Sequence, residues 1–355
     1  MRARIAVLPG DGVGPEVTLQ AVRCLQAVAT GFRHDFEFAE APVGAAAMEA
    51  GLGPLPEKTL TLARGAHAIL FGAIGLPRYS DPALKIRPEQ AILELRRELG
   101  LFANLRPVRP LPGLRHASPL KDARLEGVDF VVVRELTGGI YFGRRTKRAQ
   151  AATDECRYTV EEIERVARVA GKLARTRRGK VTSVDKANVL ETSRLWRTVV
   201  TRVLSAEFPE VRLEHQLVDS AAMRLLTHAA EFDVIVTENL FGDILSDEAA
   251  ALAGSLGLMP SASLGDGSLG LYEPIHGSAP DIAGQGIANP YGAIASAALL
   301  LRHSLSLPAE ADALEAAMTD AIVSGALTRD IAIAGAATVS TQGAGDAVIA
   351  RLVSA

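Results

Sequence analysis

Short runs of β-branched and aliphatic residues alternate with longer segments of helical period along most of this chain. The clearest runs are Ile5–Leu8, Ala68–Phe71, Phe130–Val133, Val181–Val184 and Val234–Val236. Runs of this length and composition are typical of buried strands, whereas the intervening segments repeat apolar residues every three or four positions. The alternation predicts an α/β protein, in which helices pack against sheets.

The chain of 355 residues is longer than one hydrophobic core usually supports, so we expect two lobes. No Gly/Ser-rich linker marks a boundary, which suggests that the chain passes between the lobes more than once. One helix has clear signals. Thr159 and Glu162 could form a capping box at its start, and Ile163, Val166 and Ala170 repeat with the helical period.

Composition and charge argue against several classes of function. The net charge of -3 and the pI near 6.2 give no reason to expect nucleic acid or a membrane as partner. Only Cys24 and Cys156 occur, so a reducing compartment is the simpler interpretation, although a single bridge between them is conceivable. No signal-peptide core is present, and the apolar run 293–301 is too short for a membrane span. We expect a soluble cytoplasmic protein with its basic stretch, 144–157, at the surface.

The segment 9–16, PGDGVGPE, is a glycine-rich turn between a predicted strand and a predicted helix. Its glycines at 10, 12 and 14 do not match the dinucleotide-binding fingerprint, and the Asp11 carboxylate would oppose a pyrophosphate. Pro15 suits the first turn of a helix. These features favour a tight structural turn that borders a cleft over a Rossmann-type phosphate site.

Several arginines are candidates for binding an acidic ligand. Arg96 lies on a predicted helix, Arg106 precedes Pro107, and Arg134 ends an apolar strand, where α/β proteins often carry functional groups. Converging guanidinium groups would suit carboxylates, because each can form a planar pair of hydrogen bonds with one. Spacing alone leaves open the alternative that each arginine is solvated.

Two side chains could transfer protons. Lys186 directly follows a predicted buried strand, and a lysine in a closed cleft near a metal or arginines can lose its proton near neutral pH and act as a base. Tyr141, in GGIYFG, offers a phenol that could donate or relay a proton. The alternatives are a solvated lysine and an aromatic ring packed beneath a turn.

Three aspartates are candidate metal ligands. Asp243 and Asp247 lie four residues apart and share a helix face that a divalent cation could bridge, and Asp219 is a further carboxylate. Spacing alone favours an ordinary acidic first turn. The surrounding helix is largely apolar, however, and unpaired carboxylates there would be costly. The context therefore favours a metal site.

A long segment rich in Gly, Ala and Pro runs from Glu273 to Pro290. An ordered loop of this kind can wrap backbone N–H groups around a phosphate-bearing ligand, and Asp281 could accept hydrogen bonds from ribose hydroxyls. A plain surface loop is the alternative. Its length and composition favour a functional loop.

Read together, these segments resemble the 3-isopropylmalate dehydrogenases of leucine biosynthesis. The resemblance runs almost end to end, and its motifs occur in the family's order: GDGVGPE, KIRPEQAILELR, LFANLRP, VRELTGGIYFG, SVDKANVLE, TENLFGDILSDEA, GLMPSAS and HGSAPDIAGQGIANP. It implies NAD-dependent oxidation and decarboxylation of 3-isopropylmalate to 4-methyl-2-oxopentanoate. The related enzymes that act on D-malate, tartrate or homoisocitrate are the alternative.

The resemblance also implies an architecture. We expect a two-lobed α/β fold of the isocitrate/isopropylmalate dehydrogenase type, with mixed sheets and no Rossmann domain. Residues 1–101 and 255–355 would form the cofactor-side lobe, and 102–254 would form the second lobe, with the dimer interface. Two chains would form a homodimer in which each cleft draws Lys186 and Asp219 from the neighbouring subunit.

Further implications of the resemblance concern the substrate and the protons. Arg96, Arg106 and Arg134 would bind the substrate carboxylates. Lys186 would remove the proton of the 2-hydroxyl group, and Tyr141 would protonate the enol carbon after carbon dioxide leaves.

The same resemblance implies the metal ligands and the residues that recognise the substrate side chain. Asp243, Asp247 and the partner's Asp219 would hold Mg²⁺ or Mn²⁺, and Asp219 would also lie against the substrate. Ile92 and Leu93 stand where the family presents apolar side chains to the isopropyl group. An apolar wall there disfavours isocitrate, which carries a third carboxylate.

For the cofactor, the resemblance implies NAD. Asp281–Ile282 is the NAD-type pattern, since an aspartate would repel the 2′-phosphate of NADP. The expected cofactor-binding residues are Glu273, His276, Gly277, Ser278, Ala279, Pro280, Asp281, Ile282 and Asn289.

Overall fold

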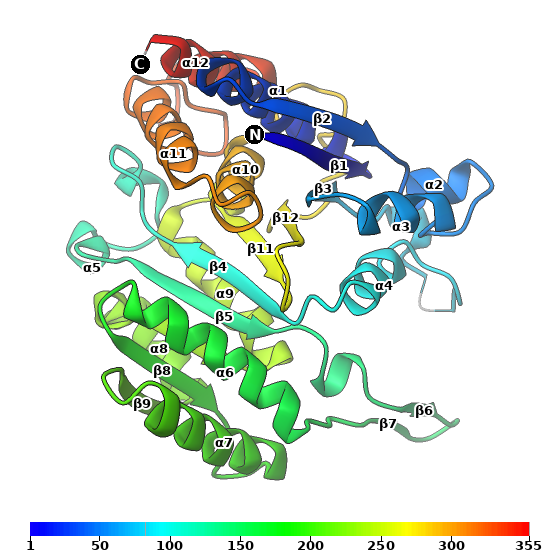
Figure 1. Ribbon diagram of the computed structural model, residues 1–355, viewed down its shortest axis with the longest axis vertical. Coiled ribbons are helices and arrows are strands. Elements are labelled where there is room, and N and C mark those ends of the chain that lie inside the picture. The colour runs from blue at the N-terminus through cyan, green and yellow to red at the C-terminus, as the bar shows by residue number, and fades with distance from the viewer. Residues whose placement is uncertain (82, 355) are drawn as a thin grey trace. The chain divides into compact units, whose positions relative to one another are not determined.

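The computed structural model describes residues 1–81 and 83–354 (Figure 1). Contacts within the chain divide it into two compact units. Unit 1 consists of Met1–Gly100, Leu111–Ala117 and Ala253–Ala355, and unit 2 consists of Leu101–Pro110 and Ser118–Leu252. The chain therefore passes repeatedly from one unit to the other.

Unit 1 contains a mixed sheet with the strand order β2-β1-β3-β12-β11. Strand β1 pairs in parallel with β2 and β3, and β12 pairs in parallel with β3, whereas β11 runs antiparallel to β12. Its core includes Ile5, Leu8, Phe71 and Tyr272, all nearly inaccessible to solvent. The strands are β1 (Arg2–Gly10), β2 (Asp35–Glu40), β3 (Ala68–Ala73), β11 (Pro260–Leu264) and β12 (Gly270–Pro274).

Helices pack onto this sheet. α10 contacts β11 and β12, α1 contacts β1 and β3, and α12 contacts α1 and α11. Every residue of α10 from Tyr291 to Leu301 is buried, so its apolar run belongs to the core. No helix in the described part of the chain is long and apolar enough to cross a membrane. The helices are α1 (Gly14–Phe32), α2 (Ala45–Glu49), α3 (Glu57–Arg64), α4 (Gln90–Glu98), α10 (Tyr291–His303), α11 (Pro308–Val323) and α12 (Thr341–Ser354).

Unit 2 contains a second mixed set of strands, in the order β4-β5-β10-β8-β9. Strands β5, β10, β8 and β9 are parallel neighbours, and β4 runs antiparallel to β5. Together with unit 1, this confirms the predicted mixed-sheet α/β class. The strands are β4 (Ala103–Val108), β5 (Phe130–Glu135), β8 (Lys180–Asp185), β9 (Arg212–Leu217) and β10 (Val234–Thr237).

Helices lie on both faces of these strands. Figure 1 shows α6 and α7 nearer the viewer than the strands, with α8 and α9 behind them. α6 contacts α7, β5 and β10, and α8 contacts β8 and β9. The helices are α5 (Asp122–Leu125), α6 (Val160–Arg175), α7 (Glu191–Glu207), α8 (Val218–Thr227) and α9 (Asn239–Ala253).

The capping box predicted for α6 is confirmed. Thr159 Oγ1 accepts a hydrogen bond from Glu162 N at 3.2 Å, and Thr159 N donates to Glu162 Oε2 at 2.7 Å. The predicted stripe faces inward, since Ile163, Val166 and Ala170 are fully buried. Local sequence signals are therefore sufficient to define this helix.

A short antiparallel ribbon, β6 (Arg145–Lys147) with β7 (Ala152–Asp154), extends from unit 2. Residues 144–155 are all exposed, which confirms the expected surface position of the basic stretch. Arg145 pairs with Asp154 across the ribbon.

Loss of the capping box should weaken unit 2. We expect Thr159→Ala to lower the free energy of unfolding by about 1 kcal/mol, because Glu162 N loses its acceptor. Chemical denaturation followed by circular dichroism measures the change. Thr198→Ala, on the exposed face of α7, is the matched control and should change stability by less than about 0.5 kcal/mol. Equal stability of the two variants would contradict this assignment.

Candidate active site

The parallel strands of unit 2 bring several polar residues to one edge. Thr237 of β10 lies opposite Arg134 of β5 and Val184 of β8, so these strands end at the same level. The carboxyl ends of parallel strands are where α/β proteins commonly bind ligands. This register therefore places Arg134, Lys186 and the start of α9 at the same edge of the strands.

Two buried arginines form the centre of this edge. Arg134 is 4% exposed and Arg106 is 7% exposed. Arg106 reaches the edge from β4, where its Nε donates to Asn104 at 2.8 Å and its Nη1 donates to Ser246 at 2.7 Å. Buried guanidinium groups require acceptors on several sides, and α9 provides some of them.

Asp243 and Asp247 supply the opposing charge from one face of α9. Arg134 Nη1 donates to Asp243, and Arg106 Nη1 donates to Asp247 at 3.0 Å. The two carboxylate side chains remain 34% and 59% exposed, so each can reach a further ligand. The shared face predicted from their spacing is confirmed.

Tyr141 joins this cluster from the turn after β5. Its hydroxyl donates to Asp243 Oδ2 at 2.8 Å, and Arg134 lies over its ring. Burial, followed by the hydrogen bond to the Asp243 carboxylate, raises the pKa of Tyr141 to about 12. The phenol is therefore protonated at neutral pH and able to donate.

Lys186 and Asp219 form a separate pair. Lys186 directly follows β8, Asp219 lies in the first turn of α8, and Lys186 Nζ donates to Asp219 Oδ1 at 2.8 Å. The adjacent ammonium group lowers the pKa of the Asp219 carboxyl. The Lys186 backbone is held by Ser193, whose Oγ accepts from Lys186 N at 3.0 Å.

The predicted metal ligands are divided between these two groups. Asp243 and Asp247 lie together, whereas Asp219 is bonded to Lys186. Within residues 1–81 and 83–354, no three Asp, Glu, His or Cys side chains are grouped so as to hold a metal ion. A site with all three aspartates would need a second chain, as the resemblance implies, and it stays a prediction.

In unit 1, helix α4 carries the remaining predicted substrate residues. Ile92, Leu93 and Arg96 lie within one turn of each other, with the first two half-buried. Arg96 Nη2 donates to Glu273 Oε1 at 2.9 Å, so Glu273, which we expected to bind cofactor, is an ion-pair partner of Arg96. Arg96 Nε is buried without a hydrogen-bond partner among the described residues.

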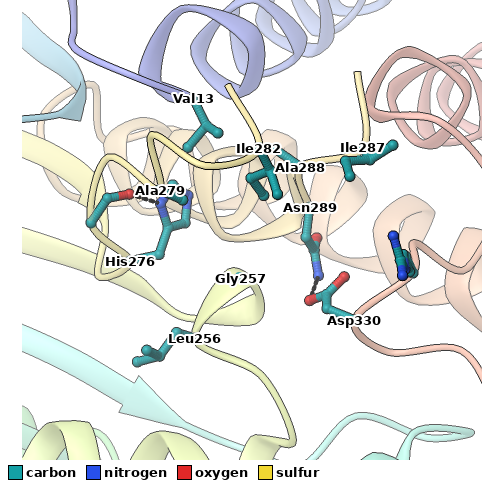
Figure 2. A pocket seen from close by; sticks show the side chains of 12 residues that line it. Val13, Leu256, Gly257, His276, Ala279, Ile282, Ile287, Ala288, Asn289 and Asp330 are labelled. Carbon is teal, nitrogen blue, oxygen red and sulfur yellow. Dashed lines mark hydrogen bonds between the residues drawn. The ribbon is translucent and has the colours of Figure 1, made fainter. Parts of the chain in front are cut away.

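A pocket of about 620 Å³ lies within unit 1, beside the loop that joins β12 to α10 (Figure 2). Five of the predicted cofactor-binding residues line it: His276, Gly277, Ala279, Ile282 and Asn289. Most of its wall is apolar. The site is therefore concave and mostly apolar with few polar groups, as small-molecule sites usually are.

The other predicted cofactor residues do not line this pocket. Ser278 is buried, and its carbonyl oxygen accepts a hydrogen bond from Val13 N at 2.8 Å. Pro280 and Asp281 are exposed beside the lining residues. The remaining walls come from residues that were not predicted individually to bind cofactor: Val13, Leu256, Gly257, Ile287, Ala288, Arg329 and Asp330.

Asp330, which was not predicted from the sequence, holds the pocket residue Asn289 in place. Its Oδ2 accepts a hydrogen bond from Asn289 Nδ2 at 3.0 Å, as Figure 2 shows, and its Oδ1 accepts one from Thr328 at 2.6 Å. Asn289 Oδ1 in turn accepts from Tyr291 N at the start of α10. Asn289 is therefore fixed at both ends of its amide. No local pattern in the sequence connects positions so far apart.

The glycine-rich N-terminal turn supports the pocket loop. A Cβ atom on Gly12, which has φ +59°, would lie 2.0 Å from the Ser278 carbonyl oxygen, so only glycine permits this close approach. Glu16 of α1 accepts hydrogen bonds from Gly284 N and from Gly286 N at 3.0 Å. The predicted structural turn that borders a cleft is confirmed, because Val13 lines the pocket.

The same turn uses Asp11 structurally. Its buried carboxylate accepts hydrogen bonds from Ala45 N at 3.0 Å, Ala46 N at 2.8 Å and Gly75 N at 2.8 Å. These contacts stabilise the start of α2 and the turn after β3.

Comparison with known proteins gives a consistent result. The family model described as isocitrate/isopropylmalate dehydrogenase matches residues 4–348. A protein named 3-isopropylmalate dehydrogenase from Bacillus subtilis is 55% identical, over 94% of this chain and 92% of its own. Another of that name, from Anaeromyxobacter dehalogenans, is 53% identical over 99% of this chain and 100% of its own.

Solved structures agree on the fold. An isocitrate dehydrogenase from Methylococcus capsulatus has 34% sequence identity and a TM-score of 0.87, with 99% of each chain covered. A beta-decarboxylating dehydrogenase from Thermococcus kodakarensis has 40% identity and a TM-score of 0.80, covering 99% of this chain and 96% of its own. The predicted fold type is thus confirmed.

Glu16 provides a test of how the pocket loop is held. We expect Glu16→Ala to accelerate amide hydrogen exchange in residues 283–287, because two backbone donors lose their shared acceptor. Mass spectrometry of peptides from this loop measures the exchange. Glu57→Ala, at the exposed start of α3, is the control and should leave the loop unaffected. Equal exchange in both variants would show that Glu16 does not hold the loop.

Proposed function

We propose, because this chain belongs to the isocitrate/isopropylmalate dehydrogenase family, that it oxidises and decarboxylates 3-isopropylmalate in leucine biosynthesis, with NAD as the oxidant. The observation that carries this proposal is the cluster at the strand ends of unit 2. There two buried arginines, two half-exposed aspartates and a protonated tyrosine meet. This combination suits an acidic substrate that must also exchange protons.

The arginines would bind the two substrate carboxylates. Arg106 and Arg134 each have their guanidinium oriented by side-chain amides, those of Asn104 and Asn239. Arg96 Nε, buried without a partner among the described residues, is a donor that a carboxylate oxygen would satisfy. Charge-assisted pairs of this kind are stronger than neutral hydrogen bonds.

Substrate choice would rest on α4. Ile92 and Leu93 are apolar and half-buried on the helix that carries Arg96. An aliphatic wall favours an isopropyl group and leaves the third carboxylate of isocitrate without a partner. D-malate, tartrate and homoisocitrate are the competing substrates of the same chemistry.

Asp243 and Asp247 suit a divalent metal, Mg²⁺ or Mn²⁺. Both offer carboxylate oxygens on one helix face, and both retain exposed surface. The partner's Asp219 would complete the set. Such an ion would lower the pKa of the substrate hydroxyl group and stabilise the negative charge that develops when carbon dioxide leaves.

Two side chains would transfer protons in each site, Tyr141 of one subunit and the partner's Lys186. Lys186 would take the proton of the 2-hydroxyl group as a hydride leaves the carbon that bears this hydroxyl. Tyr141 would return a proton to the enol carbon, for which its raised pKa keeps the hydroxyl protonated. Asp243 orients that hydroxyl.

The unit 1 pocket would bind NAD, which supplies the hydride acceptor. Burial lowers the pKa of His276, and its Nδ1 hydrogen bonds to the Gly277 carbonyl, so Nε2 is an acceptor without a partner among the described residues. An adenine amino group would satisfy it. Asp281 is exposed beside this pocket, where it would disfavour the 2′-phosphate of NADP.

We further propose a homodimer with shared active sites. Apolar side chains project from α8 and α9, namely Met223 and Ile244 at 61% and 58% exposure and Leu226 at 39%. An exposed apolar surface of this kind favours association with a second copy. The partner's Lys186 and the partner's Asp219 would then enter each site. Unit 1 would serve as the cofactor-side lobe and unit 2 would carry the interface, and a cytoplasmic location stays a prediction.

Lys186→Ala tests the proposed base. Production of NADH from 3-isopropylmalate with Mn²⁺, followed by absorbance, should show kcat reduced by about 10²-fold or more, because the 2-hydroxyl proton loses its proposed acceptor. Lys172→Ala, on the exposed face of α6, should retain wild-type activity. Undiminished activity of the Lys186 variant would refute the base. Greater kcat/KM of the wild type on D-malate, tartrate or homoisocitrate would refute the substrate assignment.

Asp281→Ala tests the cofactor assignment. The wild type should prefer NAD to NADP in kcat/KM, and the substitution should narrow this preference, because the repulsion between the carboxylate and the 2′-phosphate is removed. Asp266→Ala, an exposed acidic position outside the pocket, should leave the ratio unchanged. A wild-type enzyme that prefers NADP would overturn the assignment.

A further inference from the structure

Beneath the Arg134–Asp243 pair, unit 2 contains a second layer of polar residues that are shielded from solvent. Asn239, the first residue of α9, is 1% exposed, and Tyr158 and Glu238 are also buried. None of these three is assigned a role in the proposed chemistry. Polar groups at this depth are costly unless each is hydrogen bonded, so their partners reveal what they hold.

Asn239 fixes the plane of the Arg134 guanidinium. Its Oδ1 accepts two hydrogen bonds, one from Arg134 Nε at 3.0 Å and one from Arg134 Nη2 at 2.9 Å. One acceptor shared by these two donors prevents rotation of the guanidinium plane. Nη1 is thereby directed to Asp243.

The other end of the same amide holds the turn that carries Tyr141. Asn239 Nδ2 donates to the Gly138 carbonyl oxygen at 3.1 Å. Gly138 N donates to the buried Glu135 Oε2 at 2.7 Å. A single side chain therefore contacts both the substrate-binding arginine and the turn of the proton donor.

Tyr158 supports this arrangement from below. A Cβ atom on Gly138 or Gly139 would lie 2.7 Å or 2.4 Å from Tyr158, so the turn rests directly on its ring and hydroxyl. The hydroxyl accepts from Asn239 N at 3.0 Å and donates to Glu238 Oε2 at 3.1 Å. Burial raises the pKa of Tyr158, so the hydroxyl remains a donor at neutral pH.

We propose that Asn239 and Tyr158 are positioning residues, which together form a buried brace that sets the Arg134 guanidinium and the Tyr141 turn in their working orientation. The contribution of the brace to catalysis rests on the proposed function. Its geometry does not, because every contact lies within unit 2 and involves no ligand. The two consequences can therefore be tested separately.

Kinetics test the catalytic consequence. Asn239→Ala removes both contacts, whereas Asn239→Asp keeps an acceptor for Arg134 and loses only the donor to Gly138. We expect KM for 3-isopropylmalate to rise about tenfold or more in Asn239→Ala and to stay within about threefold of wild type in Asn239→Asp, with KM for NAD unchanged. A merely structural role would reduce the active fraction or shift both KM values. An unchanged KM for 3-isopropylmalate in Asn239→Ala would overturn the catalytic role.

Hydrogen exchange tests the brace itself, whatever the substrate. Asn239→Ala and Tyr158→Phe should each accelerate amide exchange in residues 136–143. The first variant removes the hydrogen bond from Asn239 to the turn, and the second removes the hydroxyl that accepts from Asn239 N and lies beside Gly139. The matched control is Tyr272→Phe, another buried tyrosine, whose hydroxyl bonds to Ser304 in unit 1. Tyr272→Phe should change neither the amide exchange of residues 136–143 nor the KM for 3-isopropylmalate. Unaltered exchange in both brace variants would refute the brace, and a wild type inactive on 3-isopropylmalate would refute only the proposed function.

Discussion

The ion pair between the buried Arg134 guanidinium and the half-exposed Asp243 carboxylate is the interaction on which the rest of the site depends. A guanidinium at this depth requires several acceptors, because burial of an unpaired charge is costly. Asn239 and Asp243 supply them from the start of α9, and Tyr141 donates to the same carboxylate. The arginine, the aspartate and the tyrosine are thereby held in one orientation before any ligand binds.

Sheet topology makes this arrangement possible. Parallel strands β5, β10 and β8 end at one edge, so Arg134 of β5 and Lys186 after β8 lie at the same edge with β10 between their strands. Antiparallel β4 brings Arg106 beside β5. Unit 1 carries an apolar pocket instead of a charged cluster. Its pocket is built on a long loop, which the N-terminal turn holds through Val13 and Glu16. In unit 2, strands position the charged groups. In unit 1, a loop held by hydrogen bonds to the N-terminal turn forms the apolar pocket.

Sequence reasoning succeeded where the signals are local. The capping box of α6, the shared face of Asp243 and Asp247, and the five strand segments all follow from spacing within a few residues. It did not identify Asn239 or Asp330, because their partners lie far away in the chain and no periodicity relates them. The ion pair between Glu273 and Arg96 is a long-range contact of the same kind.

The proposed sharing of each site between two chains is tested most directly by complementation between inactive variants. Lys186→Ala and Asp243→Ala chains are purified separately, mixed, unfolded and refolded together, and assayed for NADH production from 3-isopropylmalate. If the lysine acts across the interface, half of the sites in each mixed dimer are intact, and about a quarter of wild-type activity returns. No recovery, with mixed dimers demonstrated by mass spectrometry, would contradict a shared site.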